Sequence, residues 1–267
     1  MKIHQIKIDF NVTDQVKRYV FVYIIETKYC YMIDSGVGGS EQIIEKYIRS
    51  INRDIEDIKG IFLTHAHPDH IGTAAYFQEK TGCKIYASEG EANWIEDIDL
   101  QFEQRPIPNF YSLAGKSSHV DVIVKSGDII ELEKDIKIEV IGTAGHSVDE
   151  VSYKLNDVLF IGDTVPVKGD IPIYVNVADT VKSLDLLLNM KNIRYYYPAW
   201  DETYSHEIMK KKIDDAIEMI NMIGDVVSKA EKSMELSELV DFVCEEMKMP
   251  MLKTNPLFER TVLSHLN

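Results

Sequence analysis

Residues 60–70 read GIFLTHAHPDH, a short apolar run that leads directly into a cluster of histidines. The apolar part is typical of a strand buried inside a layered fold. An extended backbone projects His65 and His67 to the same side, since they are two residues apart. A proline then turns the chain, which aims Asp69 and His70 at an adjacent point. Imidazole nitrogen and carboxylate oxygen are ligands for zinc, and also for iron or manganese, so the segment predicts a metal site.

Two further residues of ligand type follow predicted strands later in the chain. His146 comes after the strand KIEVI, and Asp163 comes after the strand VLF. Either residue alone is a weak signal, because a single histidine near a strand end more often has a structural role. Together with the first cluster they complete two partial coordination shells. This recurrence disfavours the alternative that the first cluster is three solvent-exposed histidines in a loop.

The predicted elements are strands with interspersed helices, then a second strand-rich half, then a helical tail. Strand patterns cover residues 3–10, 19–34, 60–64, 83–87, 194–198 and four short runs within 120–165. Helical patterns cover residues 43–51, 71–80, 89–97, 181–190 and most of the chain after 205, with Ser40 and Asn255 as predicted N-caps. Residues 99–119 and 166–179 lack a period and predict long loops. The order indicates two packed sheets with helices outside them.

Composition and charge limit the classes of partner. The 267 residues carry 29 Lys+Arg and 44 Asp+Glu, a formal net charge of −15, which disfavours nucleic acid because phosphate binding relies on Lys and Arg. The longest apolar run, Tyr19–Ile25, is far shorter than the roughly 20 residues that span a bilayer, so we expect no membrane insertion. The N-terminus has no signal-peptide pattern, and the three cysteines are widely spaced. These features predict reduced thiols in a cytoplasmic protein.

The motif HAHPDH resembles the His-x-His-x-Asp-His signature of the metallo-β-lactamase fold hydrolases. Its companions follow in the order of that family: the Asp-Ser-Gly turn at Asp34, the histidine at His146 and the aspartate at Asp163. The resemblance covers roughly residues 1–210. It implies an α/β (α+β) fold, a four-layer αββα sandwich with the metals at one edge of the two sheets. We expect a catalytic domain over residues 1–205 and a C-terminal helical extension over 206–267 packed on it.

The same resemblance implies a role for each ligand. His65, His67 and His146 would bind a first metal, whereas Asp69 and His70 would bind a second. The resemblance places Asp163 between the two metals as a bridge and Asp34 beneath the site as structural support.

One departure from the family concerns the last strand. The family usually provides a further histidine there, but the sequence is YPAWD over 197–201, with Trp200 at the position of the histidine. Asp201 is one candidate for the missing ligand, and His206 is a weaker one. The alternative is that Trp200 packs and Asp201 is a solvated turn residue. We therefore expect zinc, one or two ions per chain, with iron or manganese as other possible metals.

The ligand set indicates a mechanism. A bound metal lowers the pKa of its water toward ~7 and polarises a carbonyl or phosphoryl oxygen. Asp69 then orients this water and delivers a proton to the leaving group. The sequence thus predicts a metallo-hydrolase, distantly similar to glyoxalase II, that acts on an ester, thioester or related bond of a small molecule.

Two other functions fit the same ligands. A mononuclear iron oxygenase similar to persulfide dioxygenases would use the positions of His65, His146 and Asp163, and a weak second site is compatible with it. A non-catalytic metal-binding module is supported only by the missing histidine. The presence of Asp69 argues against that module, because a structural metal site closes its shell. A homo-oligomer is possible, since apolar stripes of the tail can pack on the core or on a second subunit.

Overall fold

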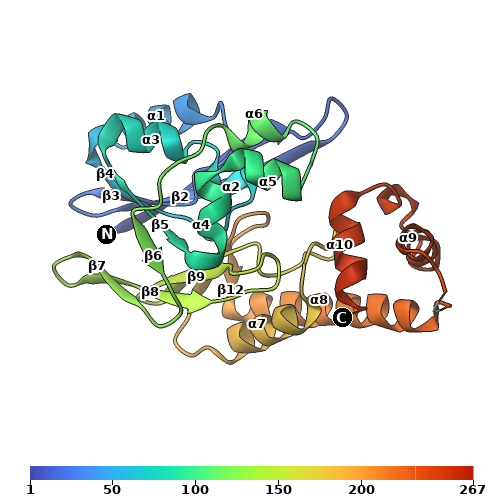
Figure 1. Ribbon diagram of the computed structural model, residues 1–267. Helices are drawn as coiled ribbons and strands as arrows, with labels where there is room; N and C mark the ends of the chain where they lie inside the picture. The colour runs from blue at the N-terminus through green and yellow to red at the C-terminus, as the bar shows by residue number, and fades with distance from the viewer. Residues whose placement is uncertain (232, 267) are drawn as a thin grey trace. The chain divides into compact units, whose positions relative to one another are not determined.

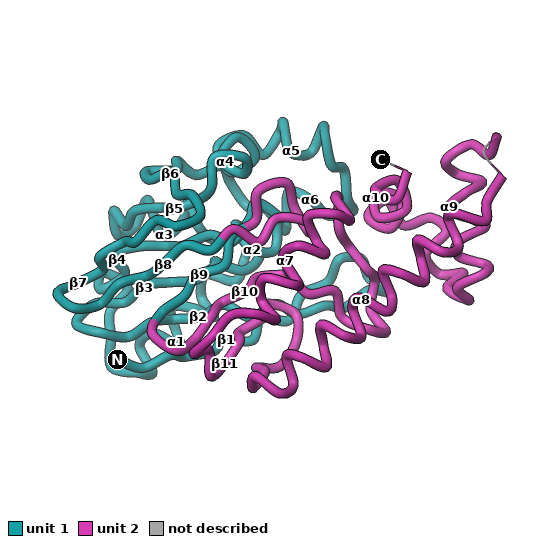
Figure 2. Tube along the Cα trace, turned by 90° about the horizontal axis from the view of Figure 1, so that it is seen from below, with its two compact units in different colours: residues 1–141, 151–155 teal, residues 142–150, 156–267 magenta. Residues whose placement is uncertain are grey.

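The computed structural model describes residues 1–231 and 233–266, and it is a mixed α/β structure (Figure 1). The chain forms two compact units (Figure 2). Unit 1 comprises Met1–Ile141 and Val151–Leu155, and unit 2 comprises Gly142–Glu150 and Asn156–Asn267.

Unit 1 is built on a mixed six-stranded sheet in the order β1-β2-β3-β4-β5-β6. The first three strands pair antiparallel, and β3 to β6 pair in parallel. Strand β3 is wholly buried, and β2 and β4 are mostly buried, as expected for strands covered on both faces. The strands are β1 Lys2–Asn11, β2 Lys17–Glu26, β3 Cys30–Ile33, β4 Ile58–Phe62, β5 Lys84–Ser88 and β6 Val122–Val124.

The apolar run over residues 19–34 is two strands, so the prediction of one continuous strand is wrong. The chain turns at residues 27–29, where the Thr27 hydroxyl donates to the Tyr29 carbonyl oxygen over 3.0 Å. β2 and β3 then pair antiparallel, with Glu26 opposite Cys30. Threonine and tyrosine also favour strands, so propensity alone does not mark this turn.

The helices of unit 1 follow its strands, and α1 and α3 lie on one face of the sheet (Figure 1). Ser40 occupies the N-cap position of α1, but its side chain does not cap the helix; its hydroxyl donates to the Val37 carbonyl oxygen. The elements are α1 Glu41–Ser50, η1 Ile55–Asp57, α2 Pro68–Ile71, α3 Ala74–Thr81, α4 Glu89–Glu96, α5 Ile98–Gln104 and α6 Phe110–Ala114.

Residues 99–119 are not a long loop, because they contain α6 and all of α5 after its first residue. Both helices are too short to be stable alone, so tertiary contacts hold them. The Gln101 side chain donates to the Ala66 carbonyl oxygen, and the Asn109 side chain donates to the Val12 carbonyl oxygen. A periodicity search misses such helices because they are too short to display a repeating apolar pattern.

Unit 1 also contains β7 Ile129–Glu133, β9 Val151–Leu155 and all of β8 Ile136–Gly142 except its last residue, with β7 and β8 paired antiparallel. In unit 2, β10 Val158–Gly162 pairs in parallel with β11 Tyr195–Pro198, which pairs antiparallel with β12 Tyr204–Ser205. Helices follow or separate these strands in the described part of unit 2. They are α7 Val177–Asn189, α8 His206–Lys229, α9 Leu236–Glu246 and α10 Pro256–Ser264, with η2 Pro250–Leu252 before α10.

The last three helices share a core of their own inside unit 2. Apolar side chains from α8, α9 and α10 pack together, among them Ile223, Val243 and Phe258, none of which is exposed. Asn255 caps α10 as predicted, since its side chain accepts from the amides of Leu257 and Phe258. The predicted boundary at 205/206 falls inside unit 2, at the start of α8. The division into domains 1–205 and 206–267 stays a prediction.

Two sequence expectations concern the state of the cysteines and membrane-spanning helices. Cys30, Cys83 and Cys244 are buried free thiols, and burial raises the pKa of Cys30 to about 11. Among residues 1–231 and 233–266, no helix is both long enough and apolar enough to cross a membrane.

Candidate metal centre

The first group of ligand residues lies just after β4 in unit 1. His65 and His67 face each other, with His65 Nε2 2.9 Å from His67 Nδ1. Strand β9 holds the backbone here, because the Val151 amide donates to the Thr64 carbonyl oxygen and the Tyr153 hydroxyl donates to the Leu63 carbonyl oxygen. The two imidazoles thus lie close together just after a strand whose end is hydrogen-bonded to β9.

Asp34 supports this strand end from below. Its carboxylate accepts from the Thr64 amide over 2.8 Å and from the Thr64 hydroxyl over 3.0 Å. Because this hydroxyl donates to Asp34, it accepts from His65 Nδ1, which lies 3.0 Å away. His65 therefore keeps the lone pair on Nε2, the atom that faces His67. The structural role that the resemblance implied for Asp34 agrees with these contacts.

The second pair of ligand residues lies on α2, the single turn that begins at Pro68. His70 Nδ1 donates to Asp34 Oδ2 over 2.9 Å, which leaves the lone pair on Nε2. That Nε2 lies 3.7 Å from Asp69 Oδ2. The His70 side chain is fully buried, whereas Asp69 keeps some exposure at 13%. The four candidate ligands His65, His67, Asp69 and His70 therefore all lie in unit 1, just after β4 and on α2.

Two buried polar residues that the sequence reasoning missed hold the peptide between the first two histidines. The Glu91 carboxylate accepts from the Ala66 amide over 2.9 Å, and the Gln101 side chain donates to the Ala66 carbonyl oxygen over 2.6 Å. Neither side chain is more than 1% exposed. Glu91 lies on α4, 25 residues after Ala66, and Gln101 lies on α5, 35 residues after Ala66, so no local pattern links them to the motif.

Unit 2 carries the remaining two predicted ligands. His146 Nε2 lies 3.4 Å from Asp163 Oδ2, and both side chains are nearly buried. His146 Nδ1 donates to the Ile173 carbonyl oxygen over 2.9 Å, so its Nε2 carries the lone pair. The Asp163 amide donates to the buried Glu150 carboxylate over 2.8 Å. Sequence reasoning missed Glu150, which holds the backbone of this candidate ligand.

The loop that carries His146 packs tightly against α7. A Cβ on Gly145, whose φ is +138°, would lie 2.4 Å from the Thr180 hydroxyl, so only glycine fits this close approach. The Ser183 hydroxyl also donates to the Ala144 carbonyl oxygen over 2.7 Å. Helix α7 begins at Val177 rather than at residue 181 as predicted, and the Asn176 side chain caps it. This earlier start brings Thr180 onto the first turn beside the loop.

The two candidates for a further ligand have other partners. Asp201 accepts hydrogen bonds from Lys212 and from the Tyr204 hydroxyl. His206 Nδ1 lies 3.3 Å from the Tyr196 hydroxyl at the start of α8. Burial by itself raises the pKa of Asp201, but the hydrogen bonds from Lys212 and Tyr204 outweigh it and hold that pKa below its usual value. These contacts favour an ion pair inside unit 2 as the role of Asp201.

Asp201→Asn is expected to reduce the free energy of unfolding by about 1 kcal/mol at pH 7, because it removes a partly buried ion pair. Since folding lowers the pKa of Asp201, the unfolded chain binds more protons in acid. The contribution is therefore complete above the pH of about 4 where an unfolded aspartate ionises, and it is lost as the pH falls through the folded pKa. Urea unfolding of both proteins at several pH values measures it.

The exposed pair of Asp179 and Lys182 provides the control, because Asp179→Asn should change stability by at most a few tenths of a kcal/mol. Metal content of the Asp201→Asn protein should equal that of the wild type. A fall in metal content would contradict the ion-pair role and support Asp201 as a ligand.

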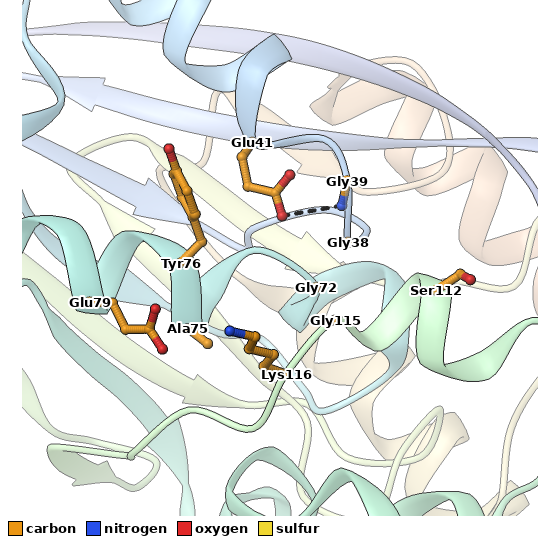
Figure 3. A pocket seen from close by; sticks show the side chains of 10 residues that line it. All are labelled: Gly38, Gly39, Glu41, Gly72, Ala75, Tyr76, Glu79, Ser112, Gly115 and Lys116. Carbon is orange, nitrogen blue, oxygen red and sulfur yellow. Dashed lines mark hydrogen bonds between the residues drawn. The ribbon is translucent and has the colours of Figure 1, made fainter.

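A pocket of about 310 Å³ lies in unit 1 next to the end of α2, where three chain segments meet at Gly38, Gly72 and Gly115 (Figure 3). The Gly38 amide donates to the Leu113 carbonyl oxygen, and the Gly72 amide donates to the Gly36 carbonyl oxygen, each over 2.7 Å. A Cβ on Gly115 would lie 2.3 Å from the Gly72 carbonyl oxygen. This crossing fixes the residues after α2, and with them the turn that carries Asp69 and His70.

The fold and the ligand residues together define a class. The protein is mixed α/β, and it presents histidine and aspartate side chains from the ends of buried strands. In comparison with protein families, residues 16–221 match the metallo-beta-lactamase superfamily. The match covers more than half of the chain, and the chain therefore belongs to the metallo-beta-lactamase superfamily.

Individual relatives agree with this assignment. A hydroxyacylglutathione hydrolase of Buchnera aphidicola is 32% identical over 147 residues, which are 55% of this chain and 47% of the relative. A probable metallo-hydrolase of Bacillus subtilis is 30% identical over 156 residues, 56% of this chain and 66% of the relative. The matched part thus spans less than two thirds of either relative. Their names support hydrolysis as the coarse class of activity.

Solved structures show the fold. A metallo-beta-lactamase family protein of Thermus thermophilus superimposes with a TM-score of 0.75 at 17% identity, over 99% of this chain and 91% of that chain. This similarity confirms the predicted fold class, the sandwich of the metallo-β-lactamase family.

Proposed function

We propose that this chain is a metal-dependent hydrolase whose metal ligands are His65, His67, Asp69, His70, His146 and Asp163. The first set of ligands is His65, His67, His146 and Asp163, and the second is Asp69, His70 and Asp163. Histidine and carboxylate ligands suit zinc, and also iron or manganese. One or two zinc ions per chain is the proposed content.

The orientation of the imidazoles carries this proposal. His70 and His146 each donate from Nδ1 to an oxygen, of Asp34 and of the Ile173 carbonyl respectively. Both therefore direct Nε2 toward a carboxylate, of Asp69 at 3.7 Å and of Asp163 at 3.4 Å. A histidine held on one nitrogen by an oxygen acceptor, with the other nitrogen directed at further donors, is the usual arrangement of a metal ligand. The donor set therefore fits a metal.

The bound metal would supply an activated water near neutral pH and would polarise the substrate carbonyl oxygen. Within this chain, Asp69 is a carboxylate with enough exposure to meet solvent and substrate. Its carboxylate accepts a hydrogen bond from the attacking water, takes up a proton and passes it to the leaving oxygen, sulfur or nitrogen. Water adds to the acyl carbon, the bond to the leaving group then breaks, and no covalent enzyme intermediate is needed.

The proposed substrate is a small molecule with an ester, thioester or related bond. The relatives named hydroxyacylglutathione hydrolase make a hydroxyacylglutathione the first substrate to test. The net charge of −15 supports the absence of nucleic acid among the partners. A cytoplasmic location and a possible homo-oligomer stay predictions.

Metal content and hydrolysis measured on the same preparations test the proposal. We expect one or two zinc ions per chain by elemental analysis, and hydrolysis of a hydroxyacylglutathione or of p-nitrophenyl acetate that disappears with a chelator and returns with zinc. His67→Ala should lose both metal and activity. His4→Ala is the control, because His4 bonds Tyr47 and Glu26 instead.

Two outcomes would overturn the proposal. Protein that contains no metal as purified and binds no added zinc would contradict the metal site itself. A single iron per chain, with oxygen consumption in the presence of a persulfide and no hydrolysis, would replace the hydrolase by the oxygenase alternative.

A further inference from the structure

We infer that the C-terminal helix α10 positions the imidazole of His146, through Thr261 and the segment Pro172–Tyr174. The inference rests on the proposed function in one respect, that His146 is a metal ligand. All the residues that carry it lie in unit 2. Thr261 and Tyr174 are positioning residues, because they act on His146 through another group.

The first link is the hydrogen bond from His146 to the backbone. His146 Nδ1 donates to the Ile173 carbonyl oxygen over 2.9 Å. The direction of this carbonyl therefore sets the rotation of the ring and the direction of Nε2. A shift of the carbonyl would turn Nε2 away from Asp163, which lies 3.4 Å from it.

The second link is a threonine of α10 that holds Ile173 from both sides. The Thr261 hydroxyl donates to the Pro172 carbonyl oxygen over 2.8 Å and accepts from the Tyr174 amide over 3.2 Å. Thr261 is fully buried. Residues 163–176 contain no helix or strand, so their backbone depends on such tertiary bonds. One hydroxyl thus fixes the two peptides that flank Ile173.

The third link is a buried pair of side chains near the end of α10. The Tyr174 hydroxyl lies 2.8 Å from His265 Nε2, and Tyr174 is fully buried. Burial lowers the pKa of His265 and raises the pKa of Tyr174, so both groups are neutral and a hydrogen bond joins the phenol to the imidazole. His265 also lies against α8, because a Cβ on Gly224 would be 3.2 Å from His265 Nδ1.

Helix α10 is itself firmly docked. Phe258 and Val262 have no exposed surface and belong to the core that α10 shares with α8 and α9. The helical tail thus reaches the metal centre through a short path of hydrogen bonds. A C-terminal segment that looks like an appendage in the sequence becomes part of the support of a ligand.

The test compares three variants of α10. Thr261→Val removes the hydroxyl but keeps the shape of the side chain, and Thr261→Ser keeps the hydroxyl. Ser264→Ala is the matched control, because this buried hydroxyl on the same helix donates to the Thr261 carbonyl oxygen within the helix itself. Zinc affinity is measured by chelator competition, and cobalt(II) absorption reports the ligand geometry.

We expect Thr261→Val to weaken zinc binding by about 10-fold, the lower end of the loss seen when a ligand loses its supporting partner. Its cobalt(II) spectrum should change, whereas Thr261→Ser and Ser264→Ala should keep the affinity and spectrum of the wild type. Equal losses in Thr261→Val and Ser264→Ala would overturn the inference, because the effect would then be general loosening of the helix. Wild-type affinity and spectrum in Thr261→Val would overturn it as well.

A measurement on metal-free protein separates this inference from the proposed function. In the metal-free wild type the His146 Nδ1 proton should give a slowly exchanging NMR resonance, because it is bonded to Ile173. Thr261→Val should broaden or abolish this resonance, and Thr261→Ser should retain it. Retention in Thr261→Val contradicts the positioning role, whatever metal the protein binds. Failure of the wild type to bind metal contradicts only the proposed function.

Discussion

Gly72→Ala is expected to reduce the free energy of unfolding by roughly 3 kcal/mol, the upper part of the range for inserting a group into a packed interior. A Cβ on Gly72 would lie 2.2 Å from the Gly38 amide nitrogen and 2.3 Å from the Leu113 carbonyl oxygen. Both contacts are to backbone atoms, which cannot rotate away. The three segments that meet at this crossing would have to separate.

The sign of this effect is informative, because helix propensity predicts the opposite. Gly72 has φ −59° and ψ −27°, an ordinary helical conformation in which alanine is favoured over glycine by about 1 kcal/mol. If Gly72→Ala were more stable than the wild type, the backbone of Gly72 could not pass as close to Gly38 and Leu113 as described. Urea unfolding gives the difference in free energy.

Gly82→Ala provides the control. Nothing lies within 4 Å of a Cβ on Gly82, but its φ of +67° is left-handed. This variant should lose only about 1 kcal/mol from backbone strain. The comparison separates a steric clash from a conformational cost. Gly72→Ala should also lose metal affinity, because Gly72 follows the turn that carries Asp69 and His70.

Asp69→Asn is expected to lower kcat/KM by about 10²–10⁴-fold, the usual contribution of a positioned acid–base group. The amide has nearly the same size as the carboxylate but cannot take up a proton and pass it to the leaving group. We expect the variant to fold, since asparagine and aspartate side chains have nearly the same shape, and a thermal unfolding scan checks this. Steady-state hydrolysis, with metal content measured on the same sample, gives the result.

Asp9→Asn makes the same change in charge on an exposed strand residue and should leave kcat/KM unchanged. An Asp69→Asn protein that contains its full metal and keeps kcat/KM within a few-fold of the wild type would remove Asp69 from the mechanism. Loss of metal together with activity would instead make Asp69 chiefly a ligand.

Local sequence patterns predicted most of the elements that have a strong period. Strand β4 and the long helix α8 were predictable, because runs of apolar residues at strand or helix spacing reflect burial directly. The turn at residues 27–29 and the short helices α5 and α6 were not. Threonine and tyrosine at that turn also favour strands, and helices as short as α5 and α6 are stable only through contacts that come from elsewhere in the chain.

The candidate ligand residues could be named from the sequence because metal binding needs particular side chains at particular spacings, and these are local properties of the sequence. Their supports were not found. Glu91 and Gln101 hold Ala66 from 25 and 35 residues away, and Thr261 acts on the segment beside His146 from 89 residues away. Glutamate, glutamine and threonine are common on protein surfaces, so nothing in their neighbours marks them as buried.

The sequence by itself determined the family, the mixed α/β class and the six candidate ligand residues, because each depends on residue type and spacing over a few positions. Only the tertiary structure decided which nitrogen of His70 and of His146 is held by an oxygen, and which buried groups hold them. It also gave Asp201 an ion pair with Lys212. The physical reason is the same in each case: a hydrogen bond depends on distance and direction in space, and residues far apart in the chain acquire both only when it folds.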